Sequence, residues 1–137
     1  MTVLSNDARR LLEQPRLAHL VALNTDGSPQ VTTAWVGLDG DEIVSGDLAE
    51  HQKVGNIRKD PRVALSIEAE GKTNGFDNYL VVYGRARITD GGAPDLLQQL
   101  AETYRGPGVK YPPMPHPTPG YVTHVAVERV AGVGPWA

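Results

Sequence analysis

Apolar and polar residues follow two different periods along this 137-residue chain. Six segments are short apolar runs or alternate apolar with polar positions, and they are rich in β-branched and aromatic residues, a pattern typical of β-strands. The predicted strands are residues 17–23, 30–38, 42–46, 62–68, 78–89 and 121–130. Asp26-Gly27 and Asp39-Gly40 separate the first three, and Asp-Gly favours a tight hairpin turn. We therefore expect those three strands to form an antiparallel meander.

Three other segments have the features of helices. Ser5 can cap a short first helix, and Pro15 ends it because proline lacks the backbone N–H that a further turn needs. A second short helix is expected within residues 50–60, where polar residues surround isolated apolar ones. Pro94 suits the first turn of a third helix, which runs to Tyr104 with leucines at helical spacing. These helices are expected to cover the sheet.

The remaining segments indicate connections. Residues 70–75 are expected to form a flexible connection, and residues 106–120 contain six prolines, which predicts an extended, semi-rigid loop. Strands do not alternate with helices, so the pattern favours a mainly β fold, an antiparallel barrel with peripheral helices. At this length we expect one domain over residues 1–137.

Charge and composition narrow the possible functions. A formal net charge of −3 provides no positive field for nucleic acid or an anionic membrane, so neither is an expected partner. The chain has no cysteine, which excludes disulfides, thiolate metal sites and cysteine nucleophiles. Charged residues interrupt residues 1–15, and no segment has the apolar length of a membrane span. We therefore expect a soluble, unprocessed, cytoplasmic protein.

No familiar catalytic spacing occurs in the sequence. It contains neither a histidine-glutamate zinc signature, nor a nucleophile elbow, nor a phosphate-binding glycine loop. The four histidines, His19, His51, His116 and His124, are widely separated and have no paired spacing. We therefore expect no metal site and assign no catalytic side chain.

The densest polar cluster is residues 51–59, at the expected start of the second helix. The first N–H groups of a helix lack internal partners and favour an anion such as a phosphate or carboxylate. Lys53 adds a positive charge there, and Arg58 adds a fork of donors for a second anionic group. The alternative is an ordinary solvated helix face, and spacing alone does not separate the two.

Landmarks over nearly the whole chain resemble one protein superfamily. They are residues 22–31, 35–40, 56–65 and 83–86, in this order and at this spacing, with Lys53 ahead of the third. The Asn-x-x-x-Asp-Pro-Arg-Val-Ala element that begins at Asn56 is the most specific of them. Together they resemble the pyridoxamine-phosphate-oxidase-like superfamily of split barrels. Residues 129–136 and the short length further resemble its branch that uses the deazaflavin coenzyme F420.

The resemblance implies a six-stranded antiparallel split β-barrel of the FMN-binding type that works as a homodimer, with each site built across the dimer interface. It implies F420 as the cofactor, with FMN as the alternative. Lys53 and Asn56 would hold the phosphate region, and residues 32–35 and 45–47 would border the ring. The expected cofactor-binding residues are Thr32, Thr33, Ala34, Trp35, Ser45, Gly46, Asp47, His51, Gln52, Lys53, Asn56, Arg58 and Tyr79.

Departures from the family pattern bear on substrate and cofactor. The pyridoxamine-phosphate oxidases place an arginine where this chain has Gln52, so pyridoxamine phosphate is a poor candidate substrate. Some relatives have an arginine at the position of His51, so one phosphate contact is either replaced by histidine or missing. Arg58, Lys59 and Arg62 offer more positive charge than one flavin phosphate needs, which mildly favours the polyanionic tail of F420.

The function that the resemblance implies is an F420-dependent oxidoreductase that passes a hydride from reduced deazaflavin to a conjugated small-molecule acceptor. Two alternatives stay open: an FMN-dependent oxidoreductase on the same fold, and a protein that binds flavin, F420 or haem without turnover. For Trp35, packing in the core or an interface is the commoner role, and for Tyr79 core packing is the default role. The proline-rich loop either forms one wall of a substrate pocket or is a plain connection.

Overall fold

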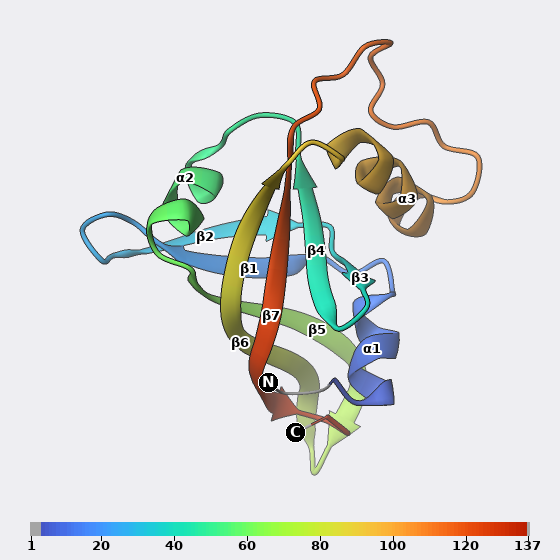
Figure 1. The fold of residues 1–137 in the computed structure, drawn as a ribbon. Coiled ribbons are helices and arrows are strands. Elements are labelled where there is room, and N and C mark those ends of the chain that lie inside the picture. The colour runs from blue at the N-terminus through green and yellow to red at the C-terminus, as the bar shows by residue number, and fades with distance from the viewer. Residues whose placement is uncertain (1–3, 137) are drawn as a thin grey trace.

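The structure, a computed structural model, describes residues 4–136. Within this part of the chain, seven strands pair into one antiparallel sheet in the order β2-β1-β5-β6-β7-β4-β3. The strands are β1 Ala18–Leu23, β2 Pro29–Ala34, β3 Gly37–Asp39, β4 Glu42–Asp47, β5 Arg62–Thr73, β6 Phe76–Asp90 and β7 Tyr121–Val133. The protein is therefore mainly β, as the sequence predicted, and Figure 1 shows β6 and β7 running side by side through the body.

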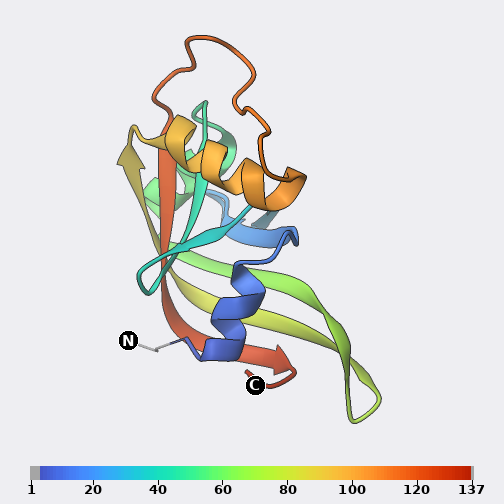
Figure 2. The same cartoon turned by 90° about the vertical axis from the view of Figure 1, so that its right-hand side faces the viewer.

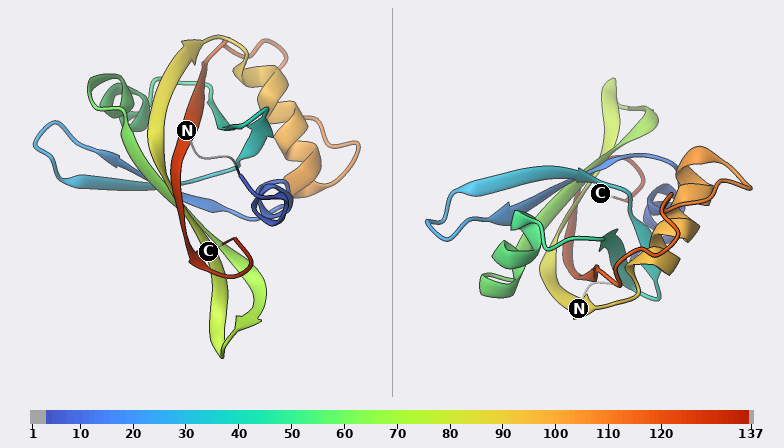
Figure 3. Two further views of the ribbon diagram at one scale, coloured as in Figure 1. Left: turned by 60° about the horizontal axis from the view of Figure 1, so that its bottom comes forward. Right: turned by 90° about the horizontal axis from the view of Figure 1, so that it is seen from above.

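The helices are α1 Asn6–Leu12, α2 Gln52–Lys59 and α3 Ala93–Arg105. The Ser5 side chain accepts a hydrogen bond from the Ala8 N–H at 3.2 Å, which confirms the predicted cap of α1, although α1 ends before Pro15. Pro94 lies in the first turn of α3, also as predicted. Two further views place α2 and the β1–β2 hairpin on one side of the molecule and α1 and α3 on the other (Figures 2 and 3).

The prediction of six strands is wrong because residues 30–38 do not form one strand. The chain turns a corner at Trp35-Val36, so that β2 pairs with β1 and β3 pairs with β4. At this corner the Val36 N–H donates to the Tyr104 hydroxyl of α3 at 3.0 Å, and Gly37 packs so closely that an added Cβ would lie 2.9 Å from Leu100. No pairing joins β2 to β3 in the described residues, so the sheet is not closed.

Both hairpins of the predicted meander form, β1 with β2 and β3 with β4, but the break between β2 and β3 places them at opposite ends of the sheet. Strand β1 pairs with β5 on its second side, and β4 pairs with β7. The predicted connection at residues 70–75 is wrong as well, because β5 continues to Thr73 and only Asn74-Gly75 forms the turn, with φ of 52° and 82°. Because the β5–β6 ladder extends to this turn, the hairpin projects from the body (Figure 1).

The core lies on the concave side of the sheet, under α1 and α2. Its largest fully buried side chains are Leu12, Ile43, Ile57, Ile67, Leu80, Val54, Val82 and Val127. Burial of each such side chain contributes about 1.5–3 kcal/mol, so Leu12 and Ile57 help to hold the short helices α1 and α2 against the strands. None of the helices within residues 4–136 is long and apolar enough to cross a membrane.

Candidate functional site

A cleft of about 240 Å³ opens where the ends of β2 and β4, the first turn of α2, the side of α3 and the loop after α3 meet. Its walls consist of Leu17, Thr33, Ala34, Trp35, Gly46, Asp47, Lys53, Leu97 and Tyr111. Six of these belong to the set expected from the sequence: Thr33, Ala34, Trp35, Gly46, Asp47 and Lys53. The two strand segments and the lysine that were expected to surround one ligand therefore do lie around one cleft.

Lys53 provides a buried positive charge in the cleft wall. Its side chain is only 6% exposed, and its Nζ lies 2.9 Å from Asp47 Oδ2, on a side chain that is 15% exposed. Asp47 Oδ2 accepts no hydrogen bond of good geometry, so Lys53 and Asp47 form an ion pair at short distance without a hydrogen bond between them. An ammonium group removed from water in this way needs an opposite charge nearby, and Asp47 supplies it.

The start of α2 adds free backbone donors beside Lys53. His51 occupies the N-cap position, its side chain makes no cap hydrogen bond, and the first turn has no acidic residue. The N–H groups of Val54 and Gly55 bond to the His51 carbonyl. The helix start is therefore electropositive, which suits an anionic group.

Asn56 does not face the cleft as the sequence suggested. Its side chain is buried, and its Nδ2 donates to Asn24 Oδ1 at 2.8 Å and to Gln30 Oε1 at 2.9 Å. Gln52 Nε2 donates to the same Asn24 oxygen at 2.6 Å. These four amides tie α2 to the β1–β2 hairpin, so Asn56 and Gln52 position the helix that carries Lys53. Asn24 and Gln30 were not expected to have such a role, although both fall within the landmark segment 22–31.

Two of the three positive charges expected to hold an anionic tail, Arg58 and Arg62, are already paired. Arg58 contacts Glu50 at 2.8 Å and Asp90 at 3.1 Å. Arg62 contacts Asp60 at 2.7 Å, and its hydrogen bonds hold the pKa of Asp60 at about 2. The charge that these arginines offer to a ligand is correspondingly reduced.

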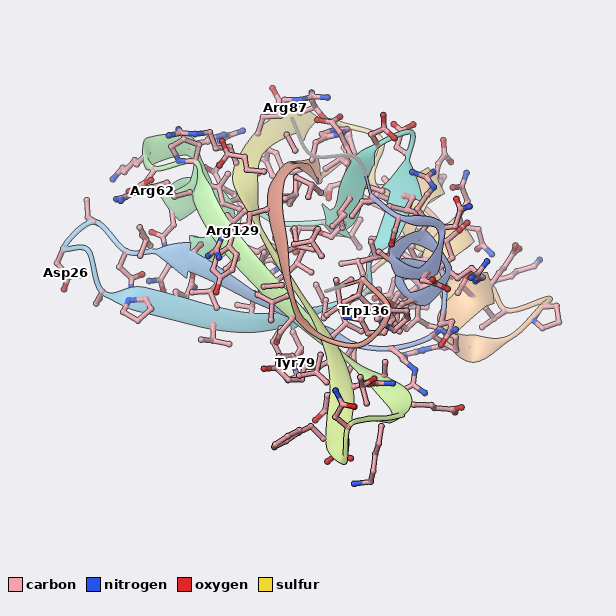
Figure 4. The ribbon with its side chains drawn as sticks, turned by 90° about the horizontal axis from the view of Figure 1, so that it is seen from below. Asp26, Arg62, Tyr79, Arg87, Arg129 and Trp136 are labelled. Atoms are coloured by element: carbon pink, nitrogen blue, oxygen red, sulfur yellow. The ribbon has the colours of Figure 1, made fainter. Side chains whose placement is uncertain are left out.

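Tyr79 lies on another part of the molecule. It lines a separate cleft of about 580 Å³ with Arg16 and His19, and its carbonyl accepts a hydrogen bond from Trp136 Nε1 at 2.9 Å. Figure 4 shows Tyr79 and Trp136 near each other and Asp26 well apart from them, at the tip of the β1–β2 hairpin. Of the other expected residues, Ser45 is buried and Thr32 half-buried, and neither lines the 240 Å³ cleft.

Aromatic residues that the sequence did not single out complete the cleft. Trp35 stacks on Tyr104 with ring centroids 5.4 Å apart and an interplanar angle of 18°, and it meets Tyr111 at 5.3 Å and 59°. The Tyr104 hydroxyl donates to the Arg16 carbonyl at 2.7 Å, and burial raises the pKa of Tyr104. Trp35 is therefore held at the corner between β2 and β3 by contacts on several sides.

The proline-rich loop forms one wall of the cleft through Tyr111. Gln98 of α3 fixes the loop at two points: its Oε1 accepts the Tyr111 N–H at 2.8 Å, and its Nε2 donates to the Val109 carbonyl at 2.7 Å. Farther along, Thr118 Oγ1 donates to the Leu48 carbonyl at 2.5 Å. The sequence left two roles open for residues 112–117 of this loop; the cleft wall is formed by Tyr111, which directly precedes them, and none of residues 112–117 lines the cleft.

The model of the pyridoxamine 5'-phosphate oxidase family matches residues 4–134. The chain belongs to this family. Comparison with curated proteins found no match. A solved F420 reductase is 26% identical, with a TM-score of 0.72 over 90% of this chain and 94% of that one. A conserved hypothetical protein from Mycobacterium tuberculosis is 25% identical, with a TM-score of 0.74 over 96% and 85%. A FAD-binding protein from Mesorhizobium loti shares the fold, at 20% identity and a TM-score of 0.65 over 94% of each chain.

Proposed function

We propose that this member of the family is a cytoplasmic, single-domain, homodimeric oxidoreductase that uses F420 to reduce a conjugated small-molecule acceptor. The observation that carries the proposal is the buried Lys53 at the start of α2, in the same cleft as Trp35. The resemblance to an F420 reductase supports the choice of coenzyme.

The residues of the cleft fit a ring cofactor with an anionic tail. Its volume of about 240 Å³ is below the roughly 300–1,000 Å³ of typical ligand pockets, so a tricyclic ring would fill it and the tail would extend outside. Lys53 and the free N–H groups of α2 would meet the phosphate. Bound in its reduced form, F420 supplies a hydride. The chain contributes orientation and exclusion of water, through Trp35 and the apolar side chains of Leu17 and Leu97.

FMN is the second candidate cofactor, and one observation favours it. Arg58 and Arg62 are paired with carboxylates, so the surplus of positive charge expected for a polyglutamate tail is smaller in the folded protein than in the sequence. A single phosphate requires less positive charge.

An uncovered sheet face supports the homodimer. Val31, Val21, Ala64 and Tyr83 are adjacent in register across β2, β1, β5 and β6. Val31 is 61% exposed and Tyr83 is 39% exposed. Val21 and Ala64 between them are half-buried, and the Arg129 guanidinium lies over the Tyr83 ring. A two-fold dimer would cover the exposed apolar area of this row with the same row of a second copy. Light scattering should give the mass of a dimer, and Val31→Lys should shift the protein toward the monomer.

Titration of the purified protein with F420, and separately with FMN, tests the proposed function. Binding is followed by cofactor fluorescence for the wild type, Lys53→Met and Lys59→Met. Lys59 is the matched control, because it belongs to the same helix but is exposed. We expect F420 to bind the wild type and the Lys59 variant, and to bind the Lys53 variant at least tenfold more weakly.

Three outcomes would count against the proposal. Selective FMN binding would favour the second candidate, and binding of neither cofactor would refute both. Tight F420 binding without oxidation of reduced F420 by any quinone or conjugated alkene would indicate a carrier or sensor in place of an enzyme.

A further inference from the structure

The arginines of this chain fall into two groups. Seven form ion pairs with carboxylates: Arg9, Arg10, Arg16, Arg58, Arg62, Arg85 and Arg87. Two lie over aromatic rings instead, Arg105 and Arg129. Arg105 forms no ion pair with any carboxylate of the described residues, so its charge is available to a ligand.

Arg105 lies at the rim of the cleft that holds Lys53. Its guanidinium carbon is 5.1 Å from the centroid of the Trp35 ring and 5.6 Å from that of Tyr111, and both rings line the cleft. Lys53, by contrast, is already paired with Asp47. The uncompensated positive charge of the cleft is therefore at its aromatic rim.

The surrounding backbone holds this rim in place. Arg105 is the last residue of α3, where Gly106 ends the helix with a φ of 110°. About two turns earlier on the same helix, Gln98 accepts a hydrogen bond from the Tyr111 N–H and so holds Tyr111 beside Trp35. One helix end and one anchored loop thus combine two aromatic rings with the Arg105 cation.

We propose that Arg105, Trp35 and Tyr111 form an acceptor subsite that selects planar, conjugated anions, such as aromatic carboxylates and phenolates, over their neutral analogues. This identification of the ligand as the acceptor rests on the proposed oxidoreductase function. Tyr104 already covers one face of Trp35, so a flat conjugated molecule would pack against the parts of the Trp35 and Tyr111 rings that line the cleft, and the guanidinium would attract its anionic substituent. Because Arg105 is exposed, the preference is modest, roughly two- to fivefold in affinity for one ion pair.

The test uses the protein without cofactor and the fluorescence of Trp35. The chain has two tryptophans, so a Trp136→Phe background leaves Trp35 as the reporter. The two probes are 4-nitrobenzoate and 4-nitrobenzamide, which share the quenching nitroaromatic ring and differ in charge. We expect 4-nitrobenzoate to quench Trp35 at lower concentration than the amide, and the difference to disappear in Arg105→Gln and at high salt.

Arg129→Gln is the matched control. Arg129 is also an exposed arginine over a tyrosine ring, 4.1 Å from the Tyr83 centroid, but it lies on β7 away from the cleft. We expect this variant to keep the preference for the anion. Equal affinity for both probes in the wild type, or a preference that survives in Arg105→Gln, would overturn the proposal.

A second arm separates the acceptor from the cofactor tail, since the glutamates of F420 are also carboxylates. F420 is titrated into the wild type and Arg105→Gln as described above. Unchanged F420 affinity together with loss of the 4-nitrobenzoate preference supports an acceptor subsite. Weakened F420 binding with an unchanged probe preference would instead show that Arg105 holds the tail, and the proposal would be wrong. Because the quenching assay contains no cofactor, it also gives its answer if the protein proves to bind neither F420 nor FMN.

Discussion

Replacement of Asp47 by Asn removes the charge that faces Lys53 while almost preserving the shape of the side chain. The Lys53 ammonium then stays in a site where its side chain is 6% exposed, with no carboxylate beside it. Removal of one member of a buried ion pair typically costs about 3–5 kcal/mol, because the remaining charge has lost both water and partner. We place this pair at the lower end, about 3 kcal/mol, because Asp47 is 15% exposed and water reaches it.

A loss of this size is easy to measure. Natural domains unfold with a free energy of about 5–15 kcal/mol, so Asp47→Asn should remove a large share of it. For a chain of this length, it corresponds to a fall in Tm on the order of 10 °C, measured by circular dichroism and by urea titration. The double variant Asp47→Asn/Lys53→Met has no buried charge, and we expect it to recover most of the lost stability.

An exposed pair with the same geometry provides the control. Lys72 Nζ lies 2.9 Å from Asp77 Oδ1 on the projecting β5–β6 hairpin, with side chains 63% and 85% exposed. Asp77→Asn should therefore cost less than about 1 kcal/mol. If Asp47→Asn costs no more than Asp77→Asn, or if the double variant is no more stable than Asp47→Asn, the Lys53 charge is not held in a low-dielectric site and our account of the cleft fails.

Two further predictions concern the fold around the cleft. Burial, aided by the charge of Arg87, lowers the pKa of His124 from 6.5. As the pH falls below about 6.5, the unfolded chain therefore takes up a proton on this histidine before the folded protein does, and the free energy of unfolding decreases. The decrease ends once the pH is below the folded-state pKa of His124. Urea titrations of the wild type and His124→Gln at several pH values should show this loss in the wild type alone, and parallel pH profiles would contradict it. At Gly120, with a φ of 63°, an added Cβ would lie 2.3 Å from the Asp47 carbonyl oxygen, so Gly120→Ala should cost roughly 2 kcal/mol or more. Gly27→Ala, with a φ of 85° and nothing within 4 Å of the added Cβ, measures the backbone cost alone, and an equal loss of Tm in both variants would refute the predicted clash.

Local sequence patterns identified most elements of this fold but not their pairing. The run 17–23 became β1, and the segment 50–60 contains α2, because apolar spacing and breakers act within a few residues. The division of residues 30–38 depends instead on the hydroxyl of Tyr104, which takes the N–H of Val36 from a distant part of the chain. No window of local sequence contains both groups, so the corner between β2 and β3 was not predictable from periodicity.

The same limit applies to the cleft. Resemblance to the superfamily identified Lys53, Trp35 and Asp47, which do lie together. It did not identify Tyr111, which the hydrogen bond to Gln98 holds beside Trp35, or Arg105, which the end of α3 brings over the same ring. The resemblance implied that Asn56 holds the phosphate region, but in the structure its side-chain donors are taken up by Asn24 and Gln30, which only the folded chain brings to it.

The distribution of charge suggests why one half of the cleft was easier to predict than the other. In the half formed by β4 and α2, the positive charges are paired with carboxylates: Lys53 with Asp47, and Arg58 with Glu50 and Asp90. These pairs form only when the fold brings their members together. The half formed by the end of α3 and the loop carries Arg105, which nothing in the described protein neutralises. A loop on a rigid scaffold tolerates change better than the scaffold itself. If both proposals hold, substitutions at Arg105 should change which acceptor is used and leave F420 affinity intact, whereas substitutions at Lys53 should weaken the binding of F420 itself and so affect every acceptor alike.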